Sequence, residues 1–412
     1  MILRKREAKT MIKIAILGFG TVGSGVYNVF NTNSEKIAGR VGDGIEVKYV
    51  LDLRDFPGNP VEDVLTHEFS DIVNDPEVKV VAEVMGGIKP AYDFTKQCLE
   101  AGKSVCTSNK ELVAAHGPEL IKIAKEHNAS YLFEASCGGG IPVIRALNEA
   151  LTADVIDEIS GILNGTTNYI LTEMTQKGAA FDDVLKDAQD MGYAERNPEA
   201  DIEGHDAQRK IAILSSLAFG KTVDYRDVYT EGITKITPAD IEFAKAMDCV
   251  IKLLAYGAKK DDGYYAMVAP FMVKKSHPLH SVDGVFNAIF VHGNMLGDAM
   301  FYGSGAGSLP TASAVAADVI EAAKNPGKNL KTEWGEGEIR LSSIDSFKGR
   351  FFVRVPADKA DEVKKIFGDD IRCIESENDR SELGFVTDVL SEKEFETKTE
   401  GLEFILSTIR CK

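Results

Sequence analysis

Cysteine, positive charge and long apolar runs are all scarce in this sequence, and each scarcity excludes a class of protein. The 6 cysteines are scattered without a CxxC pair, which argues against a zinc site and a disulfide framework and favours a reducing, cytoplasmic setting. The net charge of -17 opposes binding to nucleic acid or to an anionic membrane surface. No apolar run approaches the roughly 18 residues of a membrane span, so no membrane partner is expected.

The first residues, MILRKREAKT, are charged and lack the apolar core of a signal peptide. We expect residues 1–10 to be a flexible extension. Apolar sequence, by contrast, is plentiful in the chain as a whole. Hydrophobic residues make up 44% of the 412 positions, which is enough to give two or three domains a core each.

Strand-like and helix-like segments alternate from Met11 onward, which is typical of an α/β fold with a parallel sheet. The expected strands cover residues 12–17, 45–51, 78–85, 103–108 and 129–136, with helices around 96–101 and 120–125. We therefore predict a Rossmann-type dinucleotide-binding domain over residues 11–150, completed by residues 303–330.

The middle of the chain, residues 151–302, mixes both patterns and is predicted to be an α+β substrate and dimerisation domain. Its expected helices cover residues 207–219 and 241–255, and its β-like runs cover residues 264–273 and 287–293.

The end of the chain follows a loop-like stretch that contains Pro326 and Gly327, and residues 331–345 are predicted to be a linker. Residues 346–412 have a strand-helix-strand-strand-helix-strand order, which is ferredoxin-like.

A glycine motif directly follows the first expected strand. Residues 18–23, Gly-Phe-Gly-Thr-Val-Gly, match GxGxxG and precede a helical pattern, so the backbone can approach a pyrophosphate at a helix N-terminus. At the end of the second strand, Asp52 could bond a ribose 2′-hydroxyl, whereas Arg54 could pair with a 2′-phosphate. The expected cofactor is therefore NAD(P), and the arginine favours NADP because a guanidinium binds phosphate well.

Two longer stretches resemble a known family. GILNGTTNYILTEM (residues 161–174) and GYAERNPEADIEGHDAQRK (residues 192–210) are similar to the signature region of homoserine dehydrogenases. Further matching pieces appear in the expected order at residues 82–91, 107–114, 134–147 and 303–315. The resemblance covers about residues 11–325, and the tail resembles the ACT domain often fused to this family.

The resemblance implies NAD(P)H-dependent, reversible reduction of L-aspartate 4-semialdehyde to L-homoserine, in threonine, methionine and isoleucine biosynthesis, by a homodimer or homotetramer. It makes Lys210 the proton-transfer residue, with Lys110 beside it. The implied substrate-binding residues are Glu195, Asp206, Asp201, Gly165, Thr166 and Tyr193. The implied cofactor contacts are Gly18, Phe19, Gly20, Thr21, Val22, Gly23, Arg54, Gly86, Ser108, Lys110 and Gly307.

The same residues also have plainer interpretations. Asp206 and Lys210 are four apart, which is the spacing of an ordinary stabilising pair on a helix. Lys110 alone would be a surface cation, and Glu195 and Asp201 alone would be loop carboxylates. Their place in the matching stretches favours the functional interpretation.

The family resemblance also implies a monovalent cation, sodium, held mostly by backbone carbonyls. The matching positions are Glu134, Cys137, Gly139 and Ile141. The alternative is a glycine turn that holds no ion. His277 and His280 have a spacing that could serve a metal, but no acidic or thiol partner accompanies them, so a structural loop is expected.

Two departures from the family pattern stand out. Asn197 replaces the usual acidic residue before Pro198, and Asp201 is expected to compensate. In the tail, the loop PADKADEVKK (residues 356–365) lacks the glycine of an ACT effector loop, so inhibition by threonine should be weak or absent. Because every candidate site residue precedes about residue 310, removal of residues 346–412 should leave activity largely intact. The rival functions are a dehydrogenase of another small amino or hydroxy acid and a catalytically silent dinucleotide-binding regulator.

Overall fold

The structure is a computed structural model that describes residues 11–369, 371–376 and 380–412. The extension expected at residues 1–10 lies outside these ranges. The chain divides into two compact units. Unit 1 holds the described residues up to 153, residues 220–222 and residues 304–337, and unit 2 holds residues 154–219, 223–303 and 338–412.

A six-stranded parallel sheet forms the centre of unit 1, in the order β3-β2-β1-β4-β5-β6. Its strands are β1 (Met11–Leu17), β2 (Gly44–Leu51), β3 (Leu65–Thr66), β4 (Val78–Glu83), β5 (Ser104–Thr107) and β6 (Tyr131–Leu132). The helices of unit 1 are α1 (Thr21–Thr32), α2 (Ser34–Val41), α3 (Phe69–Val73), α4 (Ala91–Glu100), α5 (Lys110–Glu126), α6 (Val143–Arg145) and α12 (Ser308–Lys324). The strand order reverses between β1 and β4, so the predicted Rossmann-type sheet is confirmed.

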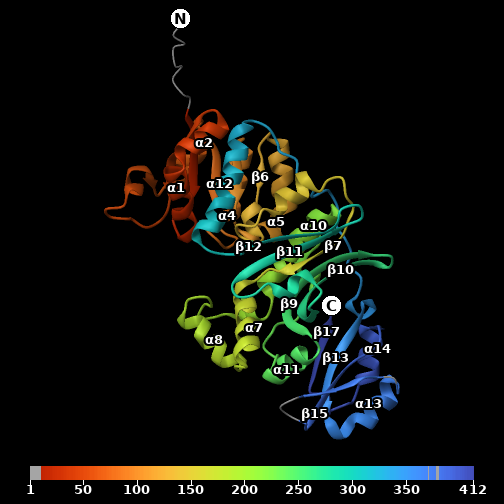
Figure 1. Ribbon diagram of the computed structural model, residues 1–412. Coiled ribbons are helices and arrows are strands. Elements are labelled where there is room, and N and C mark those ends of the chain that lie inside the picture. Colours follow the sequence, from red (N-terminus) through yellow and green to blue (C-terminus); the bar gives the residue numbers. More distant parts are fainter. Residues whose placement is uncertain (1–10, 370, 377–379) are drawn as a thin grey trace, which may run out of the picture. The chain divides into compact units, whose positions relative to one another are not determined.

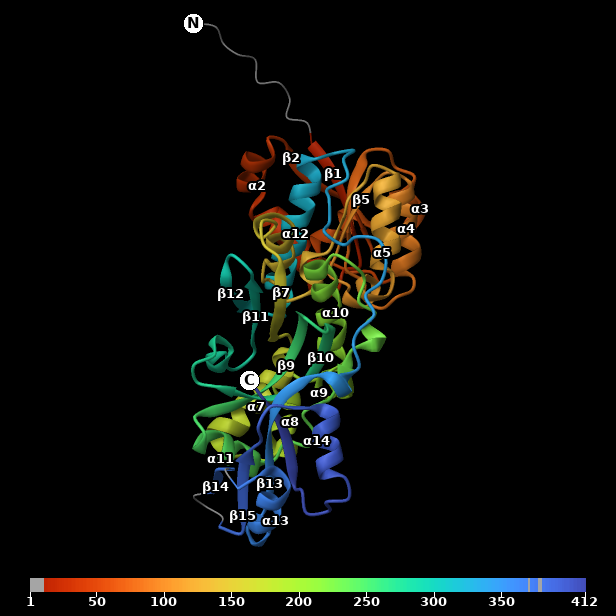
Figure 2. The same ribbon diagram turned by 90° about the vertical axis from the view of Figure 1, so that its right-hand side faces the viewer.

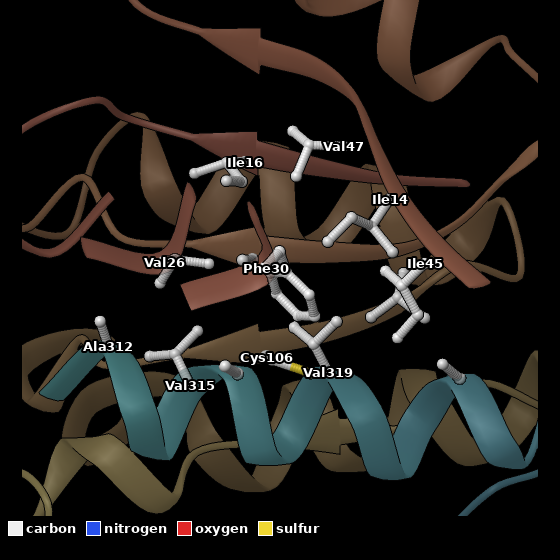
Figure 3. Packing of buried hydrophobic residues seen from close by; sticks show 14 of the residues in the cluster. Ile14, Ile16, Val26, Phe30, Ile45, Val47, Cys106, Ala312, Val315 and Val319 are labelled. Atoms are coloured by element: carbon white, nitrogen blue, oxygen red, sulfur yellow. The ribbon is translucent and has the colours of Figure 1, made fainter. Parts of the chain in front are cut away.

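Helix α12 comes late in the sequence but packs beside α1 (Figure 1). Figure 3 shows Ala312, Val315 and Val319 of α12 facing Val26 and Phe30 of α1 in one apolar cluster. A Cβ on Gly25 would lie 2.8 Å from the Ala312 Cβ, so the two helices approach closely because α1 has a glycine there. The segment after residue 303 is therefore part of the dinucleotide-type fold.

An eleven-stranded mixed sheet forms unit 2, in the order β12-β11-β7-β9-β10-β17-β13-β15-β14 with β8 and β16 paired beside it. Its strands are β7 (Ile156–Ile162), β8 (Tyr229–Thr230), β9 (Cys249–Lys260), β10 (Gly263–Lys274), β11 (Phe286–Gly293), β12 (Gly297–Ser304), β13 (Lys348–Pro356), β14 (Cys373–Glu375), β15 (Glu382–Val386), β16 (Leu390–Ser391) and β17 (Ser407–Cys411). The helices are α7 (Gly165–Lys177), α8 (Phe181–Asp190), α9 (Glu199–Ile202), α10 (His205–Phe219), α11 (Pro238–Ala246), α13 (Ala360–Phe367) and α14 (Glu392–Thr399). Figure 2 shows β11 and β12 as a hairpin, which forms one edge of the sheet.

The helix expected over residues 241–255 is wrong in its second half. Helix α11 ends at Ala246, Asp248 has a left-handed φ of 53°, and residues 249–260 form β9. Strand β9 is buried along most of its length. A strand buried on both faces is a continuous apolar run, which periodicity alone cannot distinguish from a buried helix.

The last strands of the chain are continuous with the sheet of unit 2. Strand β17 pairs with β10 in parallel and with β13 antiparallel, and the order β17-β13-β15-β14 is ferredoxin-like. On one face, Phe351 of β13 stacks on Phe395 of α14, within a cluster that also takes in α13. On the other face, Phe352 packs on Phe243 of α11. The strands of the tail are therefore covered on both faces. Among the described residues, no helix has both the length and the apolar run needed to cross a membrane.

Candidate active site

The glycine motif forms the turn between β1 and α1. Gly18 has a φ of 96°, and its N–H donates to the Leu51 carbonyl at 2.8 Å. A Cβ at Gly23 would lie 2.0 Å from the Gly18 carbonyl oxygen, whereas a Cβ at Gly20 would meet nothing within 4 Å. Gly18 therefore makes the turn, Gly23 lets the helix approach it, and Gly20 leaves the backbone open to a ligand.

Asp52 and Arg54 form an ion pair at the carboxyl end of β2, so the two alternative ribose contacts are coupled. Arg54 Nε donates to Asp52 Oδ1 at 2.9 Å and Nη2 donates to Oδ2 at 3.0 Å. The backbone N–H groups of Phe19 and Arg54 donate to the same carboxylate at 2.8 and 3.0 Å. The guanidinium and these N–H groups hold the pKa of Asp52 well below its usual range. Four donors occupy this carboxylate, while the Arg54 side chain is 62% exposed.

A pocket of about 510 Å³ opens at the carboxyl ends of β1, β2 and β4. Ligands of doubly wound sheets bind at this edge, where the strand order reverses. The ring of Phe69 stacks on Phe94 at 4.0 Å, and both belong to the wall. Residues of the pocket that were predicted to touch a cofactor are Gly18, Gly20, Arg54 and Gly86.

The other predicted cofactor residues of unit 1 lie around the same sheet edge. The ring of Phe19 packs in the core, edge-on to Tyr27 and Phe56. Its main chain, whose N–H donates to Asp52, is therefore the part that faces the glycine loop. Thr21 and Val22 begin α1, and the Ser308 hydroxyl donates to the Thr21 carbonyl at 2.6 Å. Gly307, with a φ of 115°, precedes Ser308 at the start of α12, so residues distant in sequence meet here.

Ser108 and Lys110 follow β5, and a chain of hydrogen bonds fixes this turn. The buried carboxylate of Glu83 accepts from Thr107 Oγ1 at 2.6 Å, and burial raises the pKa of Glu83. Thr107 Oγ1 accepts from the N–H of Asn109 at 2.9 Å, and the Asn109 amide donates to the Gly87 carbonyl at 2.6 Å. Asn109 also caps α5, whose first residue is Lys110. Glu83 and Asn109 were not predicted as site residues, although an asparagine directly before a helical run is a capping signal.

In unit 2, Lys210 is buried between a carboxylate and a carbonyl group. Its Nζ donates to Asp206 Oδ2 at 2.7 Å and to the Leu163 carbonyl at 2.7 Å, and both Lys210 and Asp206 are under 10% exposed. The pair on α10 that the spacing predicted does form. Its burial distinguishes it from an exposed helix pair, because charges taken out of water need fixed partners.

Asn164, which was not predicted as a site residue, joins Asp201 to Asp206. Its side-chain amide donates to Asp201 Oδ1 at 2.7 Å and to Asp206 Oδ2 at 2.9 Å. Its carbonyl oxygen accepts from the N–H of Thr167 at 2.9 Å and caps α7, the helix that starts with Gly165. Asn164 directly precedes Gly165 and Thr166, which were predicted to line the substrate site.

The loop between α8 and α9 carries Tyr193 and Glu195, and it is tied to the start of α7. The Thr166 hydroxyl donates to the Tyr193 carbonyl at 2.8 Å, and Gln189 donates to the Glu195 carbonyl at 3.1 Å. Tyr193 is 47% exposed. Six predicted site residues of unit 2 therefore lie around the N-terminus of α7: Gly165, Thr166, Tyr193, Asp201, Asp206 and Lys210. Glu195 is exposed in the same loop as Tyr193, and its contact with Gln189 of α8 is through its main chain.

The positions matched to a cation site lie in unit 1. The Glu134 carboxylate accepts from the N–H groups of Ile144 and Arg145 at 2.8 and 2.7 Å, and its own N–H donates to Asp318 Oδ2 at 2.9 Å. Burial raises the pKa of Glu134 to about 7 and that of Asp318 to about 6. The carboxylate of Glu134 therefore already accepts hydrogen bonds, and a cation at this turn would be coordinated by main-chain oxygens.

The turn at Cys137, Gly139 and Ile141 is tight. Gly139 has a φ of 55°, and a Cβ there would lie 2.5 Å from the Gly305 carbonyl oxygen. The Cys137 side chain is buried, and its sulfur accepts from the Ser136 hydroxyl at 3.8 Å. His277 accepts from the N–H of Leu279 in a short turn, as expected for a structural loop. Within the described residues, no three His, Cys, Asp or Glu side chains converge on a possible metal position.

Comparisons with known proteins agree with this geometry. A family model described as "Homoserine dehydrogenase, NAD binding domain" matches residues 18–134, and one described as "Homoserine dehydrogenase" matches residues 142–320. The chain is 45% identical over 359 residues to a homoserine dehydrogenase of Synechocystis, covering 83% of this chain and 82% of that protein.

Two solved structures are also similar to this chain. A homoserine dehydrogenase from Thiobacillus denitrificans has a TM-score of 0.90 and 35% identity, over 98% of both chains. A hyperthermophilic archaeal homoserine dehydrogenase in complex with NADPH has a TM-score of 0.65 and 29% identity, over 76% of this chain and 98% of that one.

Proposed function

The chain belongs to the homoserine dehydrogenase family, and from this premise we propose how its residues divide the reaction. The protein is an NAD(P)-dependent oxidoreductase that acts on a CH–OH group, interconverting L-homoserine and L-aspartate 4-semialdehyde. The observation that carries the division of roles is the burial of Lys210 between Asp206 and the Leu163 carbonyl.

Lys210 is the proton-transfer residue. A nicotinamide held by unit 1 would supply or take the hydride at the carbonyl carbon, and the oxygen on that carbon must gain or lose a proton. An ammonium held by a carboxylate and a carbonyl is fixed in position, so it can donate to an alkoxide without reorganising. Lys110, the first residue of α5, assists at the same substrate.

Carboxylates around α7 bind the amino group of the substrate. Asp206 and Glu195 contact homoserine, while Asp201 holds the Asn164 bridge, and Gly165, Thr166 and Tyr193 line the site. An ammonium ligand matches this acidic set by charge.

NADP is the preferred cofactor. Asp52, the residue placed to bond a ribose 2′-hydroxyl, has its oxygens occupied, and Arg54 is exposed beside it. A guanidinium is suited to a 2′-phosphate. The similar archaeal enzyme was solved with NADPH.

The main-chain oxygens of Cys137, Gly139 and Ile141 would hold a monovalent cation, sodium. Carbonyl oxygens suit a hard ion, and Glu134 contributes its main chain, because its carboxylate accepts from two backbone N–H groups. The ion would supply positive charge that stabilises the turn.

The protein works in the cytoplasm, in threonine, methionine and isoleucine biosynthesis, as a homodimer or homotetramer assembled through residues 151–302. Residues 346–412 form an ACT-like domain whose first loop is a poor effector site. In that loop, Lys359 is paired with Glu362, where an effector loop would offer glycine N–H groups.

The test is oxidation of L-homoserine with NAD and NADP in parallel, beside other small hydroxy and amino acids as substrates. Homoserine should be strongly preferred, with NADP giving the higher kcat/KM. A higher kcat/KM with another substrate would favour the rival dehydrogenase, and nucleotide binding without any turnover would favour the silent regulator.

A further inference from the structure

His67 lies at the carboxyl end of β3, next to the residue that meets the cofactor ribose in this kind of fold. Strand β3 pairs with β2 in parallel, with Leu51 opposite Thr66, so His67 and Asp52 follow neighbouring strands. Asp52, Arg54 and His67 all line the same pocket. The two ring nitrogens of His67 contact different groups, the main chain of Asp52 and the side chain of Asp55.

Both ring nitrogens of His67 face oxygen acceptors. Nδ1 lies 2.6 Å from the Asp52 carbonyl oxygen, and Nε2 lies 3.1 Å from Asp55 Oδ1. A neutral imidazole carries one N–H and can satisfy only one of these acceptors, whereas the imidazolium satisfies both. The bond to the Asp52 carbonyl, with the Asp55 carboxylate, raises the pKa of His67 above its ordinary value.

We propose that His67, as an imidazolium beside Arg54, is a second cation for the 2′-phosphate of NADP, so that cofactor preference depends on pH. This inference rests on the proposed use of NADP. The bond from Nδ1 to the Asp52 main chain fixes the ring at the ribose position. The side chains of His67 and Asp55 are 48% and 73% exposed, and an ion pair between exposed side chains is weak. A phosphate can therefore replace Asp55 as the acceptor.

The other charged groups around His67 do not compete for this role. Asp52 is bound by four N–H donors, and Asp71 on α3 accepts from the Thr66 hydroxyl at 2.6 Å. Arg54 keeps its charge throughout the accessible pH range. His67 is thus the group on this side of the pocket that changes charge near neutral pH.

The sign of the effect follows from the raised pKa. Below that pKa, His67 is a cation and attracts the 2′-phosphate. Above it, the ring is neutral and the attraction weakens, whereas NADH has no 2′-phosphate and should bind equally well throughout. The phosphate itself gains its second charge near pH 6, so pH 7 to 9 isolates the histidine.

The experiment measures dissociation constants of NADPH and NADH by nucleotide fluorescence with the full chain, from pH 7 to 9. In the unaltered protein, the preference for NADPH over NADH should fall by about tenfold as the pH rises, the effect of losing one charge-assisted hydrogen bond. His67→Asn should show the lower preference at every pH, and His67→Lys should keep the higher one, because lysine stays charged in this range. His116→Asn is the matched control, since His116 is a histidine of the same unit that pairs with Glu119 away from this pocket.

Two results would overturn the inference. If NADPH binds no more tightly than NADH at any pH, the proposed NADP preference fails and the role of His67 fails with it. If NADPH is preferred but the preference stays level from pH 7 to 9, or His67→Asn matches the unaltered protein, only the role of His67 fails.

Discussion

Asn164 connects Asp201 and Asp206, because its amide donates to Asp201 at 2.7 Å and to Asp206 at 2.9 Å, and its carbonyl oxygen caps helix α7. One side chain thus positions the helix that starts at Gly165 and orients the carboxylate that holds Lys210. Substitutions at this position can separate capping from bridging.

Asn164→Ser should keep the cap and lose the bridge, since serine caps helices about as well as asparagine but has no amide group. We expect a melting temperature near that of the unaltered protein and a KM for L-homoserine raised by about tenfold, the effect of losing a hydrogen bond to a charged group. Asn164→Ala should also lose roughly 1 kcal/mol of stability. Asn59→Ser changes another asparagine cap, in unit 1, and should leave the KM unchanged. An unaltered KM in Asn164→Ser would limit Asn164 to capping.

Lys210→Ala should lower kcat by about two to four orders of magnitude, because general acid–base assistance has this size. Binding of NADPH should stay near normal, and circular dichroism should confirm the fold. The exposed Lys177, on α7, is a control whose change to alanine should have little effect. If Lys110 acts on the same substrate, the double alanine variant should lose less than the product of the two single effects. More than about a tenth of the rate remaining in Lys210→Ala would remove it from proton transfer.

Arg54→Ala should raise the KM for NADP(H) by about tenfold or more and change that for NAD(H) much less, because only NADP carries the phosphate that a guanidinium clamps. The measurement is initial rates with both cofactors at saturating L-homoserine. Arg40→Ala, an exposed arginine of α2 in the same unit, serves as the control. Equal losses for both cofactors would make Arg54 a general part of the loop.

The buried acids Glu134 and Asp318 should make stability depend on pH. Their folded-state pKa values of about 7 and about 6 lie above those of exposed carboxyls, so the folded state holds these protons longer than the unfolded state. The free energy of unfolding should therefore fall as the pH rises from about 4.5 to 7. Melting temperatures between pH 5 and 8 measure this.

Glu134→Gln stays neutral and should flatten that slope, although it starts from lower stability because an amide oxygen can serve only one of the two N–H groups that the carboxylate binds. Glu126→Gln, at an exposed site on α5, removes the same charge and should keep the slope. A slope that survives in Glu134→Gln would assign the pH dependence to other groups.

The sequence predicted the elements whose pattern is local. The GxGxxG turn follows from glycine spacing, helix α10 from an apolar helical pattern, and helix α14 from the strand and helix order of the tail. Strand β9 was missed because a continuous apolar run fits a buried helix as well as a buried strand.

The site residues that the sequence missed act through partners distant along the chain. Asn164 and Asp206 are 42 positions apart, and Thr107 and Glu83 are 24 apart, so no spacing rule connects them. Asp52 and Arg54 are close in sequence, yet the sequence offered them only as alternative contacts, Asp52 for a ribose 2′-hydroxyl and Arg54 for a 2′-phosphate. The structure shows that the carboxylate already accepts from Arg54 and from the Phe19 N–H.

The tail gives the last prediction, and the packing changes the expectation that residues 346–412 can be removed. Arg354 of β13 is buried, and its Nε donates at 2.9 Å to Asp240, which is fully buried on α11. Arg410 of β17 donates at 2.7 Å to Glu231, and β17 covers the edge of β10.

Truncation before residue 346 should therefore leave Asp240 without its charged partner, expose the Phe243 face of α11 and open a strand edge. Each of these changes favours unfolding or aggregation. We expect the truncated protein to be poorly soluble and to lose activity through instability. Sedimentation, melting temperature and homoserine oxidation of both forms measure this.

A single substitution tests the buried ion pair of Arg354 without removing residues 346–412. Arg354→Met should cost about 3–5 kcal/mol, the range for removing one partner of a buried ion pair. Lys393→Met, on the exposed side of α14, should cost little. If the truncated protein is instead monodisperse, melts as the full chain does and keeps its kcat, the contacts of Arg354 and Arg410 contribute little. Residues 346–412 would then be a separable domain, as the sequence alone led us to expect.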